Sequence, residues 1–424
     1  MNLVPIYRRF ALGLIAVTQI FSSVLVVPGG EGLGASVFRV LVLLMAIGLF
    51  LTVGFSSVSR WPGRSIAVAA TLSVWMMVSL AWTPDLLTGI KQTSYLITLL
   101  LLIYVIENVV KDREDFTAFC KIISIFGAII TVLSIYESQT GNHFFRSSIQ
   151  DSADFDMSKL YIQEGIAWFT FDNPNDLTVH LAICFFSLVI WEGKSIISKF
   201  LYVAYFLTVL YVCDLLESRI ILFSIILFVV VCLAIGKMRR PMAVGLLVKV
   251  VLIGSGLMMV LTLALSAQVE SLDVSGFIRL QLIWSGIVMF FQTFMLGIGT
   301  GGFEAEMWTG GFFGATYGFA NPHNALARIL AENGIIGIAL FGFLLVGPAI
   351  AISSARVVNR TTAFVAGMTI AMPLLLSSGS NPLSASSIQF AIALLWVGCR
   401  FLDNNTLSDP ADAAKQPIKV AMPQ

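Results

Sequence analysis

The sequence predicts an all-α, polytopic integral membrane protein. Of its 424 residues, 58% are hydrophobic and only 12% are charged, and the mean hydropathy is +0.91. Ordinary soluble domains are about 45–50% apolar and about 25% charged. Stretches such as 222–236 and 335–352 are apolar on every face of a helix, so we expect lipid around them.

About twelve transmembrane helices are expected, because each membrane crossing needs about 20 mainly apolar residues. The candidate spans are 10–28, 34–55, 66–82, 92–110, 117–136, 176–192, 199–216, 218–236, 242–265, 333–352, 361–378 and 386–402. They divide the chain into residues 1–136 with helices one to five, a first long loop at 137–175, residues 176–265 with helices six to nine, a second long loop at 266–332, residues 333–402 with the last three helices, and a polar tail at 403–424.

Lysine and arginine set the expected orientation. Eighteen of the 25 basic residues fall in, or just beside, every second loop counted from the N-terminus. Cytoplasmic loops of membrane proteins are enriched in these residues. We therefore expect both termini in the cytoplasm and both long loops on the opposite, outer face of the membrane. The seven remaining cations are Arg39, Lys91, Arg146, Lys159, Arg219, Arg279 and Arg328.

Residues 277–291 form a further apolar segment that would change the number of crossings if it spanned the membrane. The apolar stretch after Arg279 and Gln281 is shorter than a crossing needs, which favours an interfacial or re-entrant helix. A crossing here would also turn Arg356 and Arg360 outward, against the charge rule. We therefore keep this segment on the outer face.

The overall charge excludes nucleic-acid binding. Twenty-five basic and 24 acidic residues nearly cancel, so no strongly basic surface is expected. No His/carboxylate cluster with the spacing of metal ligands appears in the sequence. We therefore expect neither a metal nor another cofactor.

The second long loop contains a glycine run. Gly297-Ile-Gly-Thr-Gly-Gly302 matches the GxGxxG pattern, but a dinucleotide site needs a preceding strand and an acid about 20 residues later. Membrane spans flank this segment instead, and no acid lies near residue 320. The glycines are more plausibly needed for sharp turns and for close approach to a ligand.

Three histidines and two arginines are candidates for function. His180 lies in an apolar span, where a packed, hydrogen-bonded histidine is expected, and His143 is expected to be a solvated loop residue. His323 differs because it follows the glycine-rich loop and precedes a helix.

Cations at a membrane edge are costly and therefore suggest function. Arg219 lies at the outer end of a span, where pairing with Glu217 or snorkelling is the alternative role, and Arg279 begins the re-entrant segment. Two guanidiniums on a face with few cations suit a diphosphate, which each can bind through two hydrogen bonds.

These residues occur in an order that resembles the O-antigen ligase and polysaccharide polymerase family. The pieces are Ser218-Arg219, Arg279 with Trp284, Gly297 to Phe303, and His323-Asn324-x-Leu326-x-x-x-Leu330-x-Glu332-x-Gly334-x-x-Gly337. Phe171-Asp172-Asn173-Pro174-Asn175-Asp176 resembles a further motif of that family. The similarity covers roughly 165–345, and its most specific part is the block that begins at His323.

The resemblance implies a metal-independent, inverting glycosyltransferase of lipopolysaccharide or exopolysaccharide biosynthesis. It would lie in the bacterial inner membrane, with the outer face, both long loops and the active site in the periplasm. Its donor would be an undecaprenyl-diphosphate-linked glycan, and its acceptor either lipid A–core, for a ligase, or another lipid-linked repeat unit, for a polymerase. Arg219 and Arg279 would hold the diphosphate leaving group, and His323 would be the general base. Substrate contacts are expected from Asn173, Asn175, Asn324 and Arg328.

Two other classes of protein fit part of the pattern. A transporter or flippase of a lipid-linked or anionic substrate would also have about twelve spans, but no repeat and no matched pair of broken spans is evident. A scaffolding membrane protein would not need a histidine together with two arginines on one face. Glycan transfer is therefore the preferred interpretation.

Overall fold

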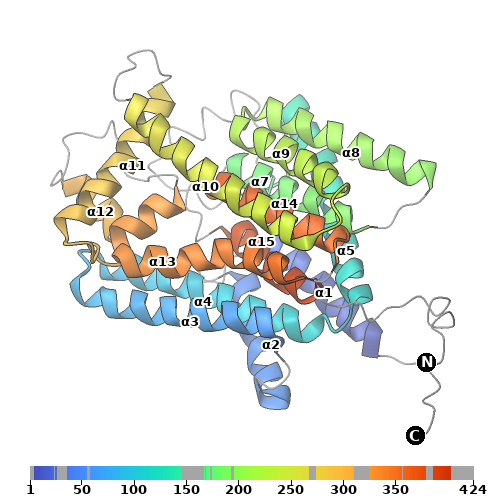
Figure 1. The fold of residues 1–424 in the computed structure, drawn as a ribbon, viewed down its shortest axis with the longest axis horizontal. Helices are drawn as coiled ribbons and strands as arrows, with labels where there is room; N and C mark the ends of the chain where they lie inside the picture. The colour runs from blue at the N-terminus through green and yellow to red at the C-terminus, as the bar shows by residue number, and fades with distance from the viewer. Residues whose placement is uncertain are drawn as a thin grey trace, which may run out of the picture.

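The computed structural model describes residues 4–22, 24–25, 36–54, 58–145, 167, 169–171, 174–191, 195–266, 274–309, 324–355, 357–378 and 385–402. Within these ranges the fold is all-α, as predicted (Figure 1). The helices are α1 (Val4–Ile20), α2 (Val37–Val53), α3 (Arg60–Ser79), α4 (Leu86–Val109), α5 (Arg113–Thr140), α7 (Pro174–Ser187), α8 (Ile196–Leu215), α9 (Arg219–Ile235), α10 (Pro241–Ser266), α11 (Val274–Gln292), α12 (Gly302–Thr309), α13 (Ala325–Ser354), α14 (Arg360–Leu375) and α15 (Ser386–Arg400), with short 3₁₀ turns η2 (Leu80–Trp82) and η4 (Leu188–Ile190).

Each of the twelve predicted spans coincides with one of these helices over most of its length. Four helical segments are by themselves long and apolar enough to cross a bilayer: Arg60–Trp82, Leu86–Val109, Arg113–Thr140 and Ala325–Ser354. The shorter apolar helices include α2, α9, α14 and α15. Helical architecture is therefore confirmed for the described residues, and twelve crossings with two periplasmic loops stay a prediction.

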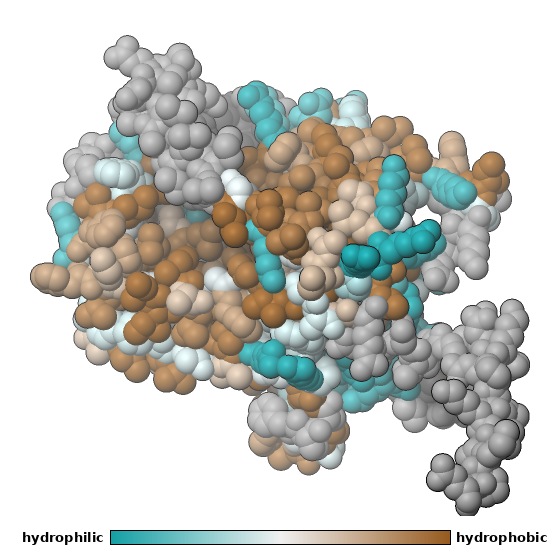
Figure 2. Space-filling view, viewed as in Figure 1, coloured by the Kyte–Doolittle hydropathy of each residue, from teal (hydrophilic) through white to brown (hydrophobic). Residues whose placement is uncertain are grey.

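α15 lies at the centre of the bundle. It contacts α1, α3, α4, α7, α13 and α14, and residues Ser386 to Cys399 are all buried. The outward faces of α2, α8 and α9 carry exposed large side chains, among them Leu51, Phe200 and Leu233. Figure 2 shows such apolar side chains spread over the surface. Apolar surface of this extent is typical of a protein surrounded by lipid, so the structure fits a membrane protein.

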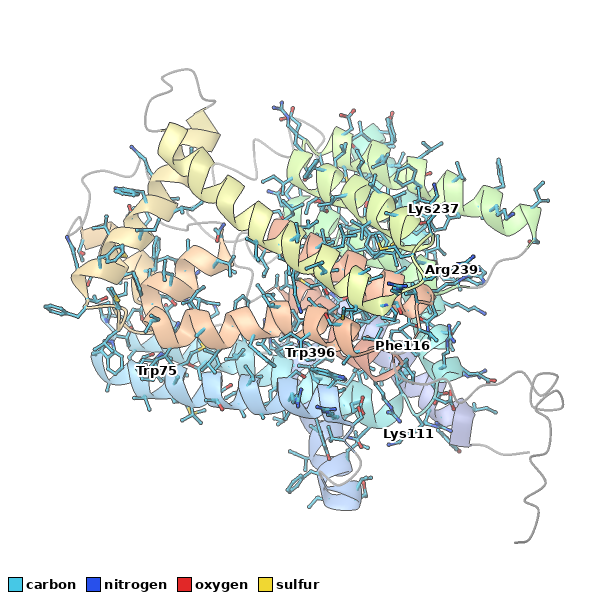
Figure 3. The ribbon with its side chains drawn as sticks, in the orientation of Figure 1. Trp75, Lys111, Phe116, Lys237, Arg239 and Trp396 are labelled. Atoms are coloured by element: carbon cyan, nitrogen blue, oxygen red, sulfur yellow. The ribbon has the colours of Figure 1, made fainter. Side chains whose placement is uncertain are left out.

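One end of the bundle is basic. Lys111, Lys237 and Arg239 lie at the same end in Figure 3, opposite Trp75. Arg400 reaches this end and donates from Nη2 to the Lys111 carbonyl oxygen over 2.9 Å. We call this the basic end and the opposite one, which carries α12, the α12 end. Four of the cations expected on the cytoplasmic side thus lie at one end of the bundle, as the charge rule predicts.

α11 coincides with the apolar segment expected to be interfacial or re-entrant. It lies at the α12 end and packs against the start of α13 (Figure 1). The ribbon does not carry α11 to the basic end. This position is compatible with the expectation that residues 277–291 stay on one side.

Candidate functional site

Arg219 is the first residue of α9, and its side chain is exposed. Its neighbour Ser218 is buried and donates from Oγ to Asn175 Oδ1 over 2.9 Å. Thr178 Oγ1 donates to Ser218 Oγ over 3.1 Å. The structure therefore brings together two motifs that the sequence separates, at the start of α7 and the start of α9. Glu217, the alternative partner expected for Arg219, has the left-handed φ of 51°. Among the described residues, no carboxylate lies within ion-pair distance of Arg219.

The α9–α14 packing fixes the level of Arg219 in the bundle. A Cβ at Gly367 would meet the Phe228 ring, and Cys232 Sγ donates to the Ala363 carbonyl oxygen over 3.5 Å. The two helices are therefore antiparallel. Extended to the other end, this register puts Arg219 level with Leu376, at the C-terminal end of α14.

The start of α13 is attached to the same turn. Asn324 caps the helix, accepting from the Ala327 N–H at 3.0 Å, and donates from Nδ2 to Ser377 Oγ over 3.1 Å. The Ala325 N–H donates to the Leu376 carbonyl oxygen over 3.1 Å. An asparagine is a preferred N-cap because its oxygen satisfies a free N–H of the first turn. Asn324, expected as a substrate contact, thus has a visible structural role.

His323 itself lies outside the described residues, as does Asn173. The chain is described again one residue after His323, at Asn324. Arg219 is therefore level with the turn to which the residues after His323 are hydrogen-bonded.

α11 approaches the start of α13 from a third direction. A Cβ at Gly286 would lie 3.1 Å from the Ala327 carbonyl oxygen, and the Ile335 N–H donates to the Met295 carbonyl oxygen over 2.9 Å. The residue numbers of the contacting pairs increase together in both segments, so α11 runs parallel to the first part of α13. Position 279 is two turns before Gly286 and on the same helix face. Because Gly286 is the position that packs against the first turn of α13, the backbone of position 279 lies about 10 Å further on, beyond the start of that helix. The side chain of Arg279 is outside the described residues.

The glycine run is a packing device. Gly297, Gly299 and Gly301 have φ of 88°, 97° and 84°, which other residues rarely adopt. A Cβ on Gly299 would lie 2.6 Å from the Thr83 Cα, and one on Gly301 2.3 Å from the Gly89 backbone nitrogen. The sharp turning expected from sequence is confirmed. The close approach that the structure shows is to other backbone segments, and approach to a ligand stays a prediction.

Arg328 lies in a buried ionic network. Its guanidinium, whose side chain is 1% exposed, is 3.1 Å from Glu332 Oε1 through Nε and 3.1 Å from Glu304 Oε1 through Nη1. The Gln92 amide, with its oxygen toward Arg328, accepts from Nε at 3.0 Å and donates to Glu332 Oε2 over 2.7 Å. Because these groups occupy the guanidinium, its visible role is to join α4, α12 and α13. The expected role of Arg328 as a substrate contact stays a prediction.

The sequence assigned no role to the partners of Arg328. Glu332 belongs to the motif that begins at His323, and its spacing of four residues from Arg328 predicts an ion pair on one helix face. Gln92 and Glu304 come from other helices, and no local pattern could have indicated them.

The other two histidines have structural surroundings. His180 is 2% exposed, with Nε2 3.3 Å from Cys184 Sγ and its ring beside Phe171, so the expected packed histidine is confirmed. His143 was expected to be solvated, and this is wrong. Its side chain is only 10% exposed, and Nδ1 lies 3.7 Å from the buried Glu137 Oε2. The cause is Glu137, whose carboxylate also accepts the Phe144 and Phe169 N–H groups and folds the loop over itself.

Chemically, the site thus presents the exposed guanidinium of Arg219 beside Asn175, level with the turn that holds the start of α13. No group of three His, Cys, Asp or Glu side chains that could hold a metal ion occurs in the described part of the chain.

A comparison with curated proteins finds no match. Residues 180–342, which contain Arg219, Arg279 and His323, match the model of a protein family described as O-antigen ligase. Over this segment the chain is therefore O-antigen ligase-like, and the resemblance seen in its motifs is confirmed.

Proposed function

We propose that the protein transfers a glycan from an undecaprenyl-diphosphate-linked donor to a sugar hydroxyl of an acceptor at the periplasmic face. The observation that carries the proposal is the convergence of three segments on the first turn of α13. Arg219 is level with Leu376, Leu376 accepts from Ala325, and α11 packs against the same turn at Gly286, two helical turns after position 279. The family match over 180–342 supports glycan transfer as the reaction class.

The exposed guanidinium of Arg219 suits the donor diphosphate. A guanidinium can donate two parallel hydrogen bonds to phosphate oxygens. Its charge stabilises the leaving group as the bond between the anomeric carbon and the diphosphate oxygen breaks. Arg279 would bind the same diphosphate from α11. The two arginines come from different helices and would approach the diphosphate from different directions.

His323 would act as the general base. An imidazole with an ordinary pKa near 6.5 accepts a proton at neutral pH. The acceptor hydroxyl would give its proton to His323 while its oxygen bonds to the anomeric carbon, and undecaprenyl diphosphate would leave. Direct attack of this kind inverts the anomeric configuration and requires no metal in the proposed scheme.

The four remaining residues predicted to contact the substrate have different roles in this scheme. Asn175 is attached to Ser218 beside Arg219, so its amide lies next to the proposed diphosphate position. Asn173 is adjacent in the motif. Asn324 caps α13 and Arg328 lies in the ionic network. We therefore propose that both residues hold in place the part of the protein that lies beneath the bound donor.

A glycan profile of a deletion strain tests the function. Complementation with the unaltered gene should restore long glycans, and His323→Ala should not, although the variant is inserted and abundant. Full restoration by His323→Ala would remove the base assignment. The glycans that accumulate in the deletion strain also identify the acceptor. Full chains left on undecaprenyl diphosphate indicate a ligase, and accumulated single repeats indicate a polymerase. Normal glycans in the deletion strain would contradict the proposed function altogether.

A further inference from the structure

Two adjoining hollows lie on the α5 side of the protein, away from the site described above. One is an apolar groove of about 660 Å³ between α5 and α8. Ile125, Val132 and Leu188 line it from α5 and η4, and Leu201 and Val203 line it from α8. Leu201 and Val203 are 53% and 52% exposed. The groove therefore opens sideways, toward the surface where lipid is expected.

The second hollow, of about 550 Å³, is polar and basic. Arg9 of α1 and Arg113 and Lys121 of α5 line it, together with one acid, Glu114. Arg8 is already paired with Asp115 at 2.6 Å. By contrast, none of the three lining cations has a carboxylate within ion-pair distance among the described residues.

The two hollows meet at Trp191. Its ring lines the apolar groove, and Lys121 Nζ, which lines the basic pocket, lies 5.8 Å from the ring centroid. Ile190, the preceding residue, lines the basic pocket. Arg360 Nη1 donates to the Trp191 carbonyl oxygen over 2.8 Å and so fixes the backbone at this junction. Lys199 adds a further cation at the rim of the groove.

A tryptophan at such a junction is typical of the membrane interface. Arg113 and Lys121 belong to the basic end, because α5 starts just after Lys111. An anionic head group at the interface with a hydrocarbon chain below it is the one ligand class that matches both hollows. Each hollow by itself also lies within the usual size range of a ligand site, about 300–1,000 Å³.

We propose that the two hollows together bind an anionic glycerophospholipid of the leaflet at the basic end. The phosphate contacts Arg9, Arg113 and Lys121, and an acyl chain fills the groove between α5 and α8. This site is at the opposite end of the bundle from Arg219. The lipid is therefore distinct from the donor in the proposed reaction, and the proposal does not depend on that reaction.

Native mass spectrometry of the full-length protein can measure the affinity for phosphatidylglycerol and for phosphatidylcholine with the same acyl chains. We expect phosphatidylglycerol to bind tighter, by about fivefold for each contributing cation. The variant R9Q/R113Q/K121Q should lose this preference. The variant K237Q/R239Q/R240Q removes the same charge from the same end and should keep it. Equal affinities for the two lipids, or an equal loss in both variants, would overturn the proposal.

The apolar half has its own matched pair. Ala128 lines the groove, whereas Ile129 is 49% exposed and does not. Ala128→Trp should therefore lower phosphatidylglycerol affinity by about tenfold or more, since an acyl chain loses much of its buried surface, and Ile129→Trp should leave it unchanged. Retained binding in Ala128→Trp would overturn the acyl-chain assignment.

Two further experiments identify the lipid that occupies the two hollows and replace the triple variant if it misfolds. Undecaprenyl phosphate carries the same type of charge on a prenyl chain, so tighter binding of this probe than of phosphatidylglycerol would contradict a glycerophospholipid as the ligand. If the triple variant does not fold, the single pair Lys121→Gln and Lys121→Arg replaces it. The glutamine variant should lose about fivefold and the arginine variant should lose nothing; equal behaviour of the two contradicts the proposal.

Discussion

Ser218 Oγ donates to Asn175 Oδ1 over 2.9 Å, which joins the start of α9 to the start of α7 directly beside Arg219. The bond is formed where both chain segments turn into helices. It therefore holds the backbone of Arg219 in place while leaving its guanidinium exposed. A fixed backbone under an exposed guanidinium suits a residue that binds a ligand with defined geometry.

Replacement of Arg219 should show whether geometry or charge matters. If the diphosphate is bound through two parallel hydrogen bonds, Arg219→Lys should lower transfer nearly as far as Arg219→Ala, by about 100-fold or more, which is the usual effect of removing one such transition-state donor. The measurement is glycan transfer in membranes, normalised to protein. Arg39→Lys is the matched control, because Arg39 is another cation outside the basic end and stacks on Tyr95, 4.1 Å from its ring centroid. Full transfer with Arg219→Lys would mean that charge alone suffices.

The Arg328 network predicts strong coupling between buried charges. Arg328→Met leaves the Glu332 carboxylate, 1% exposed, without its cation and should cost about 3–5 kcal/mol. The double variant R328M/E332Q removes both charges and should be more stable than R328M alone. Thermal unfolding in detergent, read as a double-mutant cycle, measures this. Simple additivity of the two substitutions would show that the pair contributes nothing as a unit.

Gly334 tests the packing role of the glycines. Its φ is 62°, and a Cβ there would lie 2.2 Å from the Met295 carbonyl oxygen, so Gly334→Ala should destabilise the protein by more than about 1 kcal/mol. Gly342 lies in the same helix with nothing within 4 Å of its Cβ position. Gly342→Ala should therefore be neutral or stabilising by up to about 1 kcal/mol. The melting temperatures of the two variants should move in opposite directions or differ clearly; equal shifts would contradict the argument.

The same glycine explains how far the sequence could predict this region. The tenth apolar span was expected to begin at residue 333, and a helix was expected directly after His323. α13 joins the two: it begins at Ala325, and its backbone is interrupted at Gly334. Its polar first turns are tolerated because Gln92, Glu304 and Thr300 supply partners from elsewhere in the chain. Hydropathy finds the apolar part of a helix but contains no information about such distant partners.

The order of motifs likewise indicated more of the site than any single residue did. It joined Arg219 with the segment that begins at His323, and the α9–α14 register puts Arg219 level with the turn that holds Ala325. It also suggested Arg328 and Asn324 as substrate contacts, whereas the structure gives both residues protein partners. Side chains that cap or neutralise a helix cannot be told from ligand contacts by their type alone.

Asp85 predicts a dependence of stability on pH. Its carboxylate caps α4, accepting from the Thr88 N–H at 3.0 Å and from Thr88 Oγ1 at 2.7 Å, and these bonds lower the pKa of Asp85 below its ordinary 3.8. The stabilisation is therefore complete above the ordinary pKa and is lost as the pH falls through the lowered one. Asp85→Asn can still cap the helix but does not titrate. At neutral pH its free energy of unfolding should be lower than that of the unaltered protein by at most about 1 kcal/mol. This difference should shrink as the pH falls below 3.8. A gap that is constant down to acid pH would contradict the titration.

The orientation of the bundle can be tested with single cysteines in a background without the five native ones. Thr309 is exposed at the α12 end and Arg239 is exposed at the basic end. The charge rule puts the basic end in the cytoplasm. Thr309→Cys should therefore react with an impermeant thiol reagent in intact spheroplasts, whereas Arg239→Cys should react only after lysis. The reverse pattern would put Arg219 and the start of α13 on the cytoplasmic side. It would exclude a periplasmic transfer site, whatever the activity of the His323 and Arg219 variants.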